Sequence, residues 1–247
     1  MNKETKMREM GGKAARMVAM SVLMAVTPLA ATAGDKVETT IATDFVSQYY
    51  WRGQELGDIS VQPTLGIGWK GLSLTAWGSV GLSDNADTKE FDLTVAYAVK
   101  GFHVGVTDYW FNYPREKYFA YRNNNTSHVF EGNLGYDFGF LSVNWFTNFA
   151  GNDGKNKSGH RAYSSYVELA APFRLAKCDW TASVGAVPYA TTFYAKADGF
   201  AVTSLSVKAC YEVPVTEKFH VPLFAQVSAN PSTGKAYLVA GFTLKAF

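Results

Sequence analysis

The sequence has few cysteines, few prolines and, beyond its first thirty or so residues, no long apolar run. Of 247 residues, 2 are Cys and 8 are Pro. Two cysteines in a chain of this length exclude a disulfide-dense scaffold. A transmembrane helix needs about 20 consecutive apolar residues, and no such stretch follows residue 33. The main part of the chain therefore either stays in water or crosses a membrane without helices.

The N-terminal segment carries the three parts of a secretory signal peptide. The apolar run MVAMSVLMAVTPLA precedes the small-residue pattern Ala31-Thr32-Ala33, and five basic residues come before it: Lys3, Lys6, Arg8, Lys13 and Arg16. The alternative is an N-terminal membrane anchor, but a run of roughly 14 residues that contains Pro28 is short for a span. We expect cleavage after Ala33, which leaves 34–247 as a single domain.

The net charge of the chain argues against nucleic-acid binding. Without residues 1–33 the chain keeps 18 basic and 19 acidic residues, a net charge of −1, so the basic balance of the whole sequence belongs to the leader. Proteins that bind nucleic acid usually carry a basic patch or stripe. We therefore expect no nucleic-acid partner.

The remaining sequence alternates between apolar and polar residues. Segments 72–82, 91–99 and 141–149 each place apolar side chains on one parity and mostly small or polar side chains on the other. Period two over nine or more residues predicts a β-strand with one apolar and one polar face. Globular strands average about 5–6 residues, whereas membrane strands need about 9–11.

Turn signals divide the chain at regular intervals. Short turns are expected at 70–71, 100–101 and 138–139, and near 174–177 and 214–217. Longer polar connections lie at 52–58, 83–90, 113–125, 151–160, 192–199 and 229–235. Five short turns that alternate with six longer loops predict about twelve antiparallel strands, with both termini at the short-turn end. This rhythm is typical of an all-β transmembrane barrel with short periplasmic turns and longer extracellular loops.

Two considerations favour a closed barrel over a soluble β-sandwich. Aromatic residues gather at the strand ends, as in the girdles of membrane barrels. An open sheet edge is also not tolerated in hydrocarbon, so the first strand (about 38–51) should pair with the last (about 236–247). The expected girdle residues are Tyr49, Trp51, Trp69, Trp110, Trp145 and Phe149.

The segment 44–80 resembles the opening of the TorF-type porin family. The shared features are Asp44, the aromatics that follow it, Arg52-Gly53, a polar loop and Gln62 at the start of the next strand. The resemblance implies an outer-membrane location and a pore, and it carries over no catalytic residues. Chains of outer-membrane barrels also commonly end in phenylalanine, as this one does at Phe247, although on the opposite parity from Leu244.

If the apolar parity faces lipid, the polar parity faces the interior. Charged rings in a wet lumen set solute preference, whereas paired charges would plug it, and twelve strands lie between the filled and the open limits. We expect Arg52, at the end of the first strand, to be a charge at the mouth. The residues expected to line the pore are Asp44, Gln48, Arg52, Gln62, Asp92, Glu131, Asn133, Asp137, Asn144, Asn148, Glu168, Lys208, Gln226 and Lys245.

Signals for covalent chemistry are weak. His160 lies in a polar loop near Ser158, Ser164 and Ser165, without a G-x-S-x-G elbow, and solvated surface is the simpler interpretation. No histidines have metal-ligand spacing, so no metal or cofactor is expected. Cys178 shares parity with the apolar face and Cys210 with the polar face, which disfavours a disulfide between them.

These observations predict an outer-membrane barrel of a Gram-negative bacterium that passes small polar solutes by diffusion. Outer-membrane lipid, the solutes and the barrel-assembly machinery are the expected partners. Two alternatives stay open at this point. One is a lipid-modifying enzyme at the membrane surface, and the other is a closed barrel used for structure or for binding.

Overall fold

The computed structural model describes residues 36–83, 87–113, 117–122, 126–217 and 219–246. The expected signal peptide, 1–33, and the terminal Phe247 lie outside these residues. Within them, no helix has the length and apolarity to cross a membrane.

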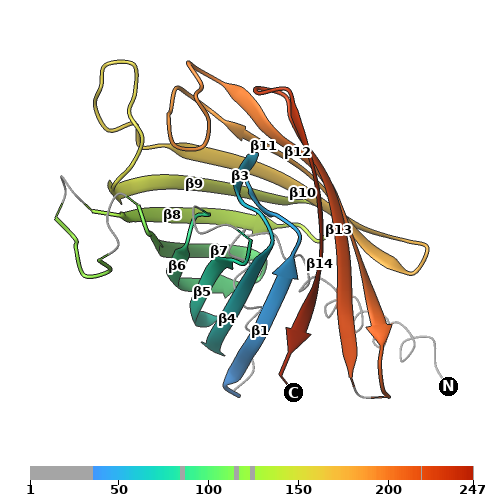
Figure 1. Cartoon of the computed structure of the whole chain (residues 1–247). Helices are drawn as coiled ribbons and strands as arrows, with labels where there is room; N and C mark the ends of the chain where they lie inside the picture. Colours follow the sequence, from blue (N-terminus) through green and yellow to red (C-terminus); the bar gives the residue numbers. More distant parts are fainter. Residues whose placement is uncertain (1–35, 84–86, 114–116, 123–125, 218, 247) are drawn as a thin grey trace.

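Twelve antiparallel strands form a closed barrel (Figure 1). The wall consists of β1 (Glu38–Val46), β4 (Ser60–Trp69), β5 (Leu72–Gly81), β6 (Glu90–Val99), β7 (Phe102–Phe111), β8 (His128–Asp137), β9 (Ser142–Gly151), β10 (Ser165–Leu175), β11 (Cys178–Val187), β12 (Ala201–Pro214), β13 (His220–Asn230) and β14 (Lys235–Lys245). The strand number and the all-β class predicted from the alternation are confirmed.

The first and last strands close the ring. Strand β1 pairs with β14 from Ala42↔Lys245 to Val46↔Gly241, and on its other side it pairs with β4 from Glu38↔Gly68 to Val46↔Ser60. In Figure 1, β1 and β14 lie side by side in blue and dark red. The start of β1 and the end of β14 therefore lie at the short-turn end of the barrel, as predicted.

Three of the short turns are built by residues with a left-handed backbone. Lys70-Gly71 joins β4 to β5 with φ of 49° and 90°, and Lys100-Gly101 joins β6 to β7 with φ of 50° and 86°. Ala176-Lys177 likewise joins β10 to β11. Two positive φ angles in a two-residue loop define the type I′ turn, whose twist matches antiparallel strands.

The wall is apolar outside and polar inside. In β6 the outward residues Phe91, Leu93 and Val95 are 37–51% exposed, whereas Asp92 and Thr94 on the other parity are buried. Water-soluble proteins bury most of their large apolar side chains, so this arrangement is inverted relative to theirs. It is the arrangement of a barrel whose outer wall contacts lipid.

The first strand is shorter than predicted. Strand β1 ends at Val46, and the chain then leaves the wall to form a separate hairpin of β2 (Tyr49–Trp51) and β3 (Gln54–Gly57). The alternation of apolar residues continues across Ser47 and Gln48, so it gives no sign of this departure. The segment 49–57 is thus an inserted hairpin, and the predicted strand 38–51 with its following loop 52–58 is wrong beyond Val46.

Two of the other long connections also differ from simple surface loops. Part of 188–200, between β11 and β12, is fully buried, including Tyr194 and Thr191. By contrast, the described part of the 112–127 connection leans on the outside of the wall: Tyr118 packs 5.7 Å from Phe91 and 5.8 Å from Trp110, measured between ring centroids. The connection between β13 and β14 is only four residues, 231–234.

Candidate functional site

The β2–β3 hairpin, which we call the plug hairpin (residues 47–59), crosses the lumen from one wall to the other. Its side chains or backbone contact nine of the twelve wall strands, through Trp77, Glu90, Tyr109, Glu131, Phe146, Tyr166, Ser204, Asn230 and Tyr237. A segment with contacts spread over so many strands occupies the lumen at its own level.

A two-residue turn places Arg52 at the tip of the plug hairpin. Trp51 pairs with Gln54, and the intervening Arg52 and Gly53 have φ of 49° and 92°, nearly the angles of the Lys-Gly turns in the wall. Gly53 is packed tightly: a Cβ atom there would lie 2.0 Å from the carbonyl oxygen of Thr203. The Gly53 carbonyl also accepts a hydrogen bond from Asn230 Nδ2 at 2.8 Å.

The Arg52 guanidinium forms a two-point ion pair with Glu131 on β8. Nη1 lies 2.5 Å from Oε2 and Nη2 lies 3.1 Å from Oε1, and the side chains are 4% and 0% exposed. The register between β8 and β9 shifts between Phe130 and Glu131. Such irregularities re-aim side chains, and this one lies directly at the charged residue. Burial tends to lower the pKa of Arg52, but the charge of Glu131 outweighs it and the pKa is raised.

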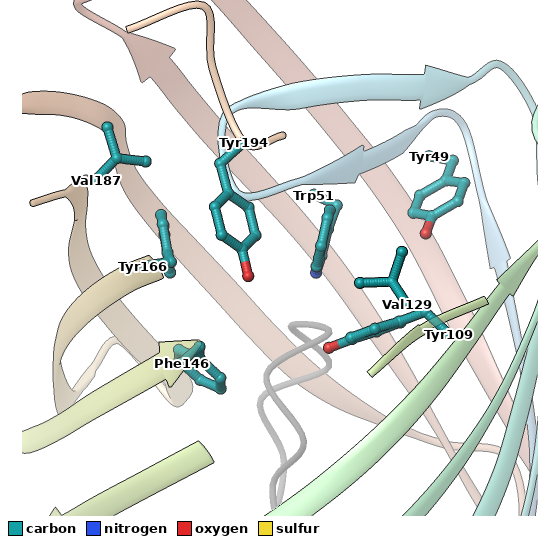
Figure 2. Close-up of a cluster of buried hydrophobic side chains, with 8 residues drawn as sticks. All are labelled: Tyr49, Trp51, Tyr109, Val129, Phe146, Tyr166, Val187 and Tyr194. Carbon is teal, nitrogen blue, oxygen red and sulfur yellow. The ribbon is translucent and has the colours of Figure 1, made fainter. Parts of the chain in front are cut away.

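Four aromatic rings surround the same guanidinium; we call Trp51, Phe146, Tyr166 and Tyr194 the ring cage. The Arg52 Cζ atom lies 4.7, 3.9, 4.9 and 5.3 Å from their respective centroids. Figure 2 shows these rings gathered at the Trp51 end of the hairpin, with Tyr109 beside them. Each distance lies within the roughly 6 Å over which a cation is attracted to a ring face.

Tyr194 extends the site from the 188–200 connection. Its phenol donates a hydrogen bond to Glu131 Oε2 and lies 3.0 Å from Arg52 Nη1. Burial, with the nearby charge of Glu131, raises the pKa of Tyr194 well above its ordinary value, so the phenol stays protonated. A neutral phenol can donate to the carboxylate while it accepts from the guanidinium.

A second polar contact anchors the base of the plug hairpin. The Tyr49 phenol donates a hydrogen bond to the buried Glu90 of β6, and its ring lies 5.9 Å from that of Trp77. Burial and the charge of Glu90 raise the pKa of Tyr49 well above its ordinary value. Tyr50, on the opposite face, hydrogen-bonds Ser204 of β12 at 3.0 Å.

Most residues expected to line the lumen do lie on the inner face. Eleven of the fourteen are buried: Asp44, Arg52, Gln62, Asp92, Glu131, Asn133, Asn144, Asn148, Glu168, Lys208 and Gln226. Arg52 is buried inside the barrel against Glu131, which lies three residues from the long-loop end of β8.

The remaining three residues lie toward the margins of the lumen. Gln48 lies in the plug hairpin, where its side-chain amide donates to Glu55 at 2.6 Å. Asp137 belongs to a short turn and accepts a hydrogen bond from the Gly139 amide. Lys245 is exposed at the end of β14.

Two of the six expected girdle residues are inside the barrel. Tyr49 and Trp51 are 1% and 4% exposed and belong to the buried cluster of Figure 2, so their assignment to the girdle is wrong. The chain turns inward after Val46, which reverses the face that their parity predicted. Trp69, Trp145 and Phe149 are 44–50% exposed on the outer wall, and Trp110 is half-buried beneath Tyr118.

The residues considered for catalysis do not lie together in the structure. His160 is exposed in its loop, while Ser164 is fully buried and bonded to Thr191. A different histidine, His128, pairs with Asp108 at 2.7 Å near the long-loop end of the outer wall. Its other ring nitrogen lies 2.5 Å from the Tyr118 carbonyl oxygen, so neither nitrogen is available to a substrate hydroxyl.

The two cysteines are free thiols. Cys210 lies directly opposite Asp179 in the ladder between β11 and β12, so Cys178 is offset by one residue and faces the other side of the wall. Side chains on opposite faces cannot be bridged without moving the backbone. Among the described residues, no group of three or more His, Cys, Asp or Glu side chains could hold a metal ion.

Comparison with known proteins yields structural likenesses only. No family model and no curated protein matches the chain. A solved structure from work on the mechanism behind the in-meso crystallization of membrane proteins aligns with a TM-score of 0.45 and 9% identity, over 84% of this chain and 83% of that one. The Salmonella typhi OmpF complex with daunomycin aligns with a TM-score of 0.35 and 10% identity, over 87% of this chain and 98% of that one. The assignment as a closed twelve-stranded antiparallel barrel rests on the strand pairing of the chain itself.

Proposed function

We propose that the chain is an outer-membrane barrel of a Gram-negative bacterium that conducts small polar solutes, with a preference for cations, when the plug hairpin is displaced. The exposed apolar outer wall supports the membrane location. The resemblance of 44–80 to the TorF-type porins supports the pore. We regard the protein as a non-enzymatic channel.

The charge of the interior is the observation that carries this proposal. Among the described residues, the buried acidic side chains are Asp44, Glu90, Asp92, Glu131 and Glu168, and the buried lysine and arginine side chains are Arg52 and Lys208. Buried acidic side chains thus outnumber buried lysine and arginine side chains five to two. Charged side chains in a lumen bias the passage of ions, and a negative interior favours cations.

The plug hairpin has the features of a removable obstruction. It forms a two-stranded sheet of its own and joins the wall only where the chain enters and leaves it, at Val46 and Ser60. It is held by the polar contacts of Arg52 with Glu131 and of Tyr49 with Glu90, and by the packing of Tyr49 and Trp51 in the buried aromatic cluster. Its withdrawal would therefore leave the twelve-stranded wall intact.

Planar-bilayer recording of two variants tests the channel. In the first, 47–59 is replaced by Asn-Gly, a two-residue hairpin turn that can join the paired residues Val46 and Ser60. In the control, the same Asn-Gly replaces 156–160 between the bridged residues Lys155 and Arg161, which lie in an exposed loop. We expect the first variant to show larger and longer current steps than the wild type or the control. In a KCl gradient its reversal potential should indicate potassium preference.

A closed barrel without transport is the alternative that the present conformation itself favours, because the plug hairpin fills the lumen. It would be established if both variants fold but neither gives current steps. A chloride-selective current in the hairpin-less variant would contradict the cation preference while retaining the channel.

A further inference from the structure

The surroundings of the Arg52 guanidinium have the composition of a binding site for a free organic cation. Glu131 accepts two hydrogen bonds from the guanidinium, and the ring cage contributes four aromatic rings with centroids within 5.3 Å of Cζ. Paired N–H donors facing a carboxylate are the geometry in which guanidinium groups are recognised. Aromatic rings around a cation are the usual way to bind it away from water.

Most of this site belongs to the barrel and not to the plug hairpin. Glu131, Phe146 and Tyr166 project from three consecutive wall strands, β8, β9 and β10, and Tyr194 comes from the 188–200 connection. Of the cage, only Trp51 moves with the hairpin. Withdrawal of the hairpin would thus leave a carboxylate and three rings in place, facing the vacated lumen.

The barrel also holds its carboxylate before any cation arrives. Tyr194 and Tyr109 both donate hydrogen bonds to Glu131, and Tyr194 also contacts Asn148 Oδ1 at 3.3 Å. These contacts do not depend on Arg52. A carboxylate held in place by its neighbours binds a cation at a lower entropic cost than a mobile carboxylate does.

We propose that this cage is a binding site for guanidinium-bearing organic cations and that Arg52 is its tethered occupant, so that a free cation of this type competes with Arg52 and releases the plug hairpin. The inference rests on the proposed function, for which it supplies a class of solute and a means of opening. Arg52 occupies the site as a substitute ligand within the same chain.

Tethering sets the concentration at which a free cation can compete. A ligand on a short linker acts as if it were present at about millimolar concentration. The wild-type barrel should therefore respond only to millimolar or higher free guanidinium compound. Removal of the Arg52 side chain should lower the required concentration by at least roughly tenfold, because the internal competitor is gone.

The geometry further predicts discrimination between cations. A planar guanidinium can donate to both oxygens of Glu131 at once and stack on the rings, whereas a compact ammonium group acts as a point charge. Methylguanidinium and methylammonium carry the same charge on a similar small frame. We expect methylguanidinium to bind at least about tenfold more tightly, as suits a planar two-point site.

The experiment measures binding to purified, folded Arg52→Ala protein in detergent, by the tryptophan fluorescence of the cage and by the unfolding temperature. Lys100→Ala is the matched control, because Lys100-Gly101 has the same turn geometry, with φ of 50° and 86°, but lies at the short-turn end. Methylguanidinium should raise the unfolding temperature of Arg52→Ala at concentrations that leave Lys100→Ala and the wild type unchanged. Equal responses to methylguanidinium and methylammonium would overturn the proposal.

Two further measurements cover the case in which Arg52→Ala does not fold. The variant with Asn-Gly in place of 47–59 retains Glu131, Phe146, Tyr166 and Tyr194, so it should bind methylguanidinium with the same preference. In the wild type, millimolar methylguanidinium should increase the frequency of current steps more than methylammonium does. The absence of a preference in either assay contradicts the cage.

The outcomes also separate this inference from the proposed function. Selective binding without any current would refute the channel and leave the cation site. Current through the hairpin-less variant without selective binding would refute the cation site and leave the channel.

Discussion

Arg52 and Glu131 lie 79 positions apart in the sequence, yet their side chains form two hydrogen bonds in the interior of the barrel. The two N···O distances are 2.5 and 3.1 Å. One belongs to the plug hairpin and the other to β8 of the wall. Both groups are almost fully buried. The contacts that hold the plug hairpin in the lumen thus include a buried ion pair with the wall.

Glu131→Gln should destabilise the protein strongly. The amide keeps the shape of the carboxyl group but removes the charge that compensates the buried guanidinium, and breaking a buried ion pair on one side costs about 3–5 kcal/mol. Urea unfolding in lipid vesicles measures the difference. Glu55→Gln is the matched control: Glu55 is exposed and accepts a hydrogen bond only from Gln48 among the contacts described above, so a change of about 1 kcal/mol or less is expected.

The double variant Arg52→Met with Glu131→Met completes this test. Replacement of both charges by apolar side chains of similar length is often neutral or stabilising in a buried site. We expect the double variant to be more stable than Glu131→Gln alone. If all three variants unfold at the wild-type urea concentration, the pair does not hold the hairpin.

Gly53→Ala should expel the plug hairpin from its seat. An alanine Cβ would lie 2.0 Å from the Thr203 carbonyl oxygen, which is wall backbone and cannot give way cheaply. Gly139→Ala separates this clash from backbone strain, because Gly139 has a φ of 87° but open space where the Cβ would lie. In both variants the left-handed conformation of the alanine should lower the free energy of unfolding by roughly 1–2 kcal/mol.

Only Gly53→Ala should make the peptide bond after Arg52 accessible to trypsin in the folded barrel. Limited proteolysis followed by mass spectrometry of the fragments detects this cleavage. Equal cleavage after Arg52 in both variants would mean that strain, and not the clash, displaces the hairpin.

The two thiols should react at different stages. Cys210 is 8% exposed on the inner face near Val46 and Phe224, whereas Cys178 is half-buried on the outer face. A maleimide should label Cys178 of the folded protein first, and Cys210 only after unfolding. If neither thiol reacts before reduction and the protein band shifts in a gel after reduction, the two cysteines instead form a disulfide.

The wall of the barrel could be predicted from the sequence because its signals are local. Period two identifies each strand, and the basic-glycine pairs at 70–71 and 100–101 identify the tight turns. The inner residues follow once the parity of a strand is known. Asp92 in β6 and Lys208 in β12 are buried on the face that this parity predicted.

The plug hairpin escaped prediction because its decisive contacts are long-range. Tyr49 and Trp51 share the parity of the outward-facing Phe45, so continuous alternation placed them on the lipid side. The local signal that could have corrected this is Arg52-Gly53, which resembles Lys70-Gly71 and marks a two-residue turn between Trp51 and Gln54. Even so, an inward position depends on Glu131 and Asn230, and no local pattern reveals those partners.

Because the chain leaves the wall after Val46 to form the plug hairpin, one edge of β14 lacks a partner strand. Hydrogen exchange should detect this gap. Strand β14 loses its partner N-terminal to Ala240, whose amide and carbonyl bond to Ser47. By the alternation of antiparallel ladders, the amides of Ala236 and Leu238 point the same way as that of Ala240, toward a hollow of about 510 Å³.

The amides of Tyr237 and Val239, by the same alternation, point to β13, with which β14 is paired along its whole upper half. We therefore expect the amides of Ala236 and Leu238 to exchange much faster than those of Tyr237 and Val239, measured by NMR in detergent micelles. The lower half of β14 provides the internal control, because Leu244 is paired with Thr43 of β1. Slow exchange at all four upper positions would mean that another segment covers this edge and that the wall is continuous there.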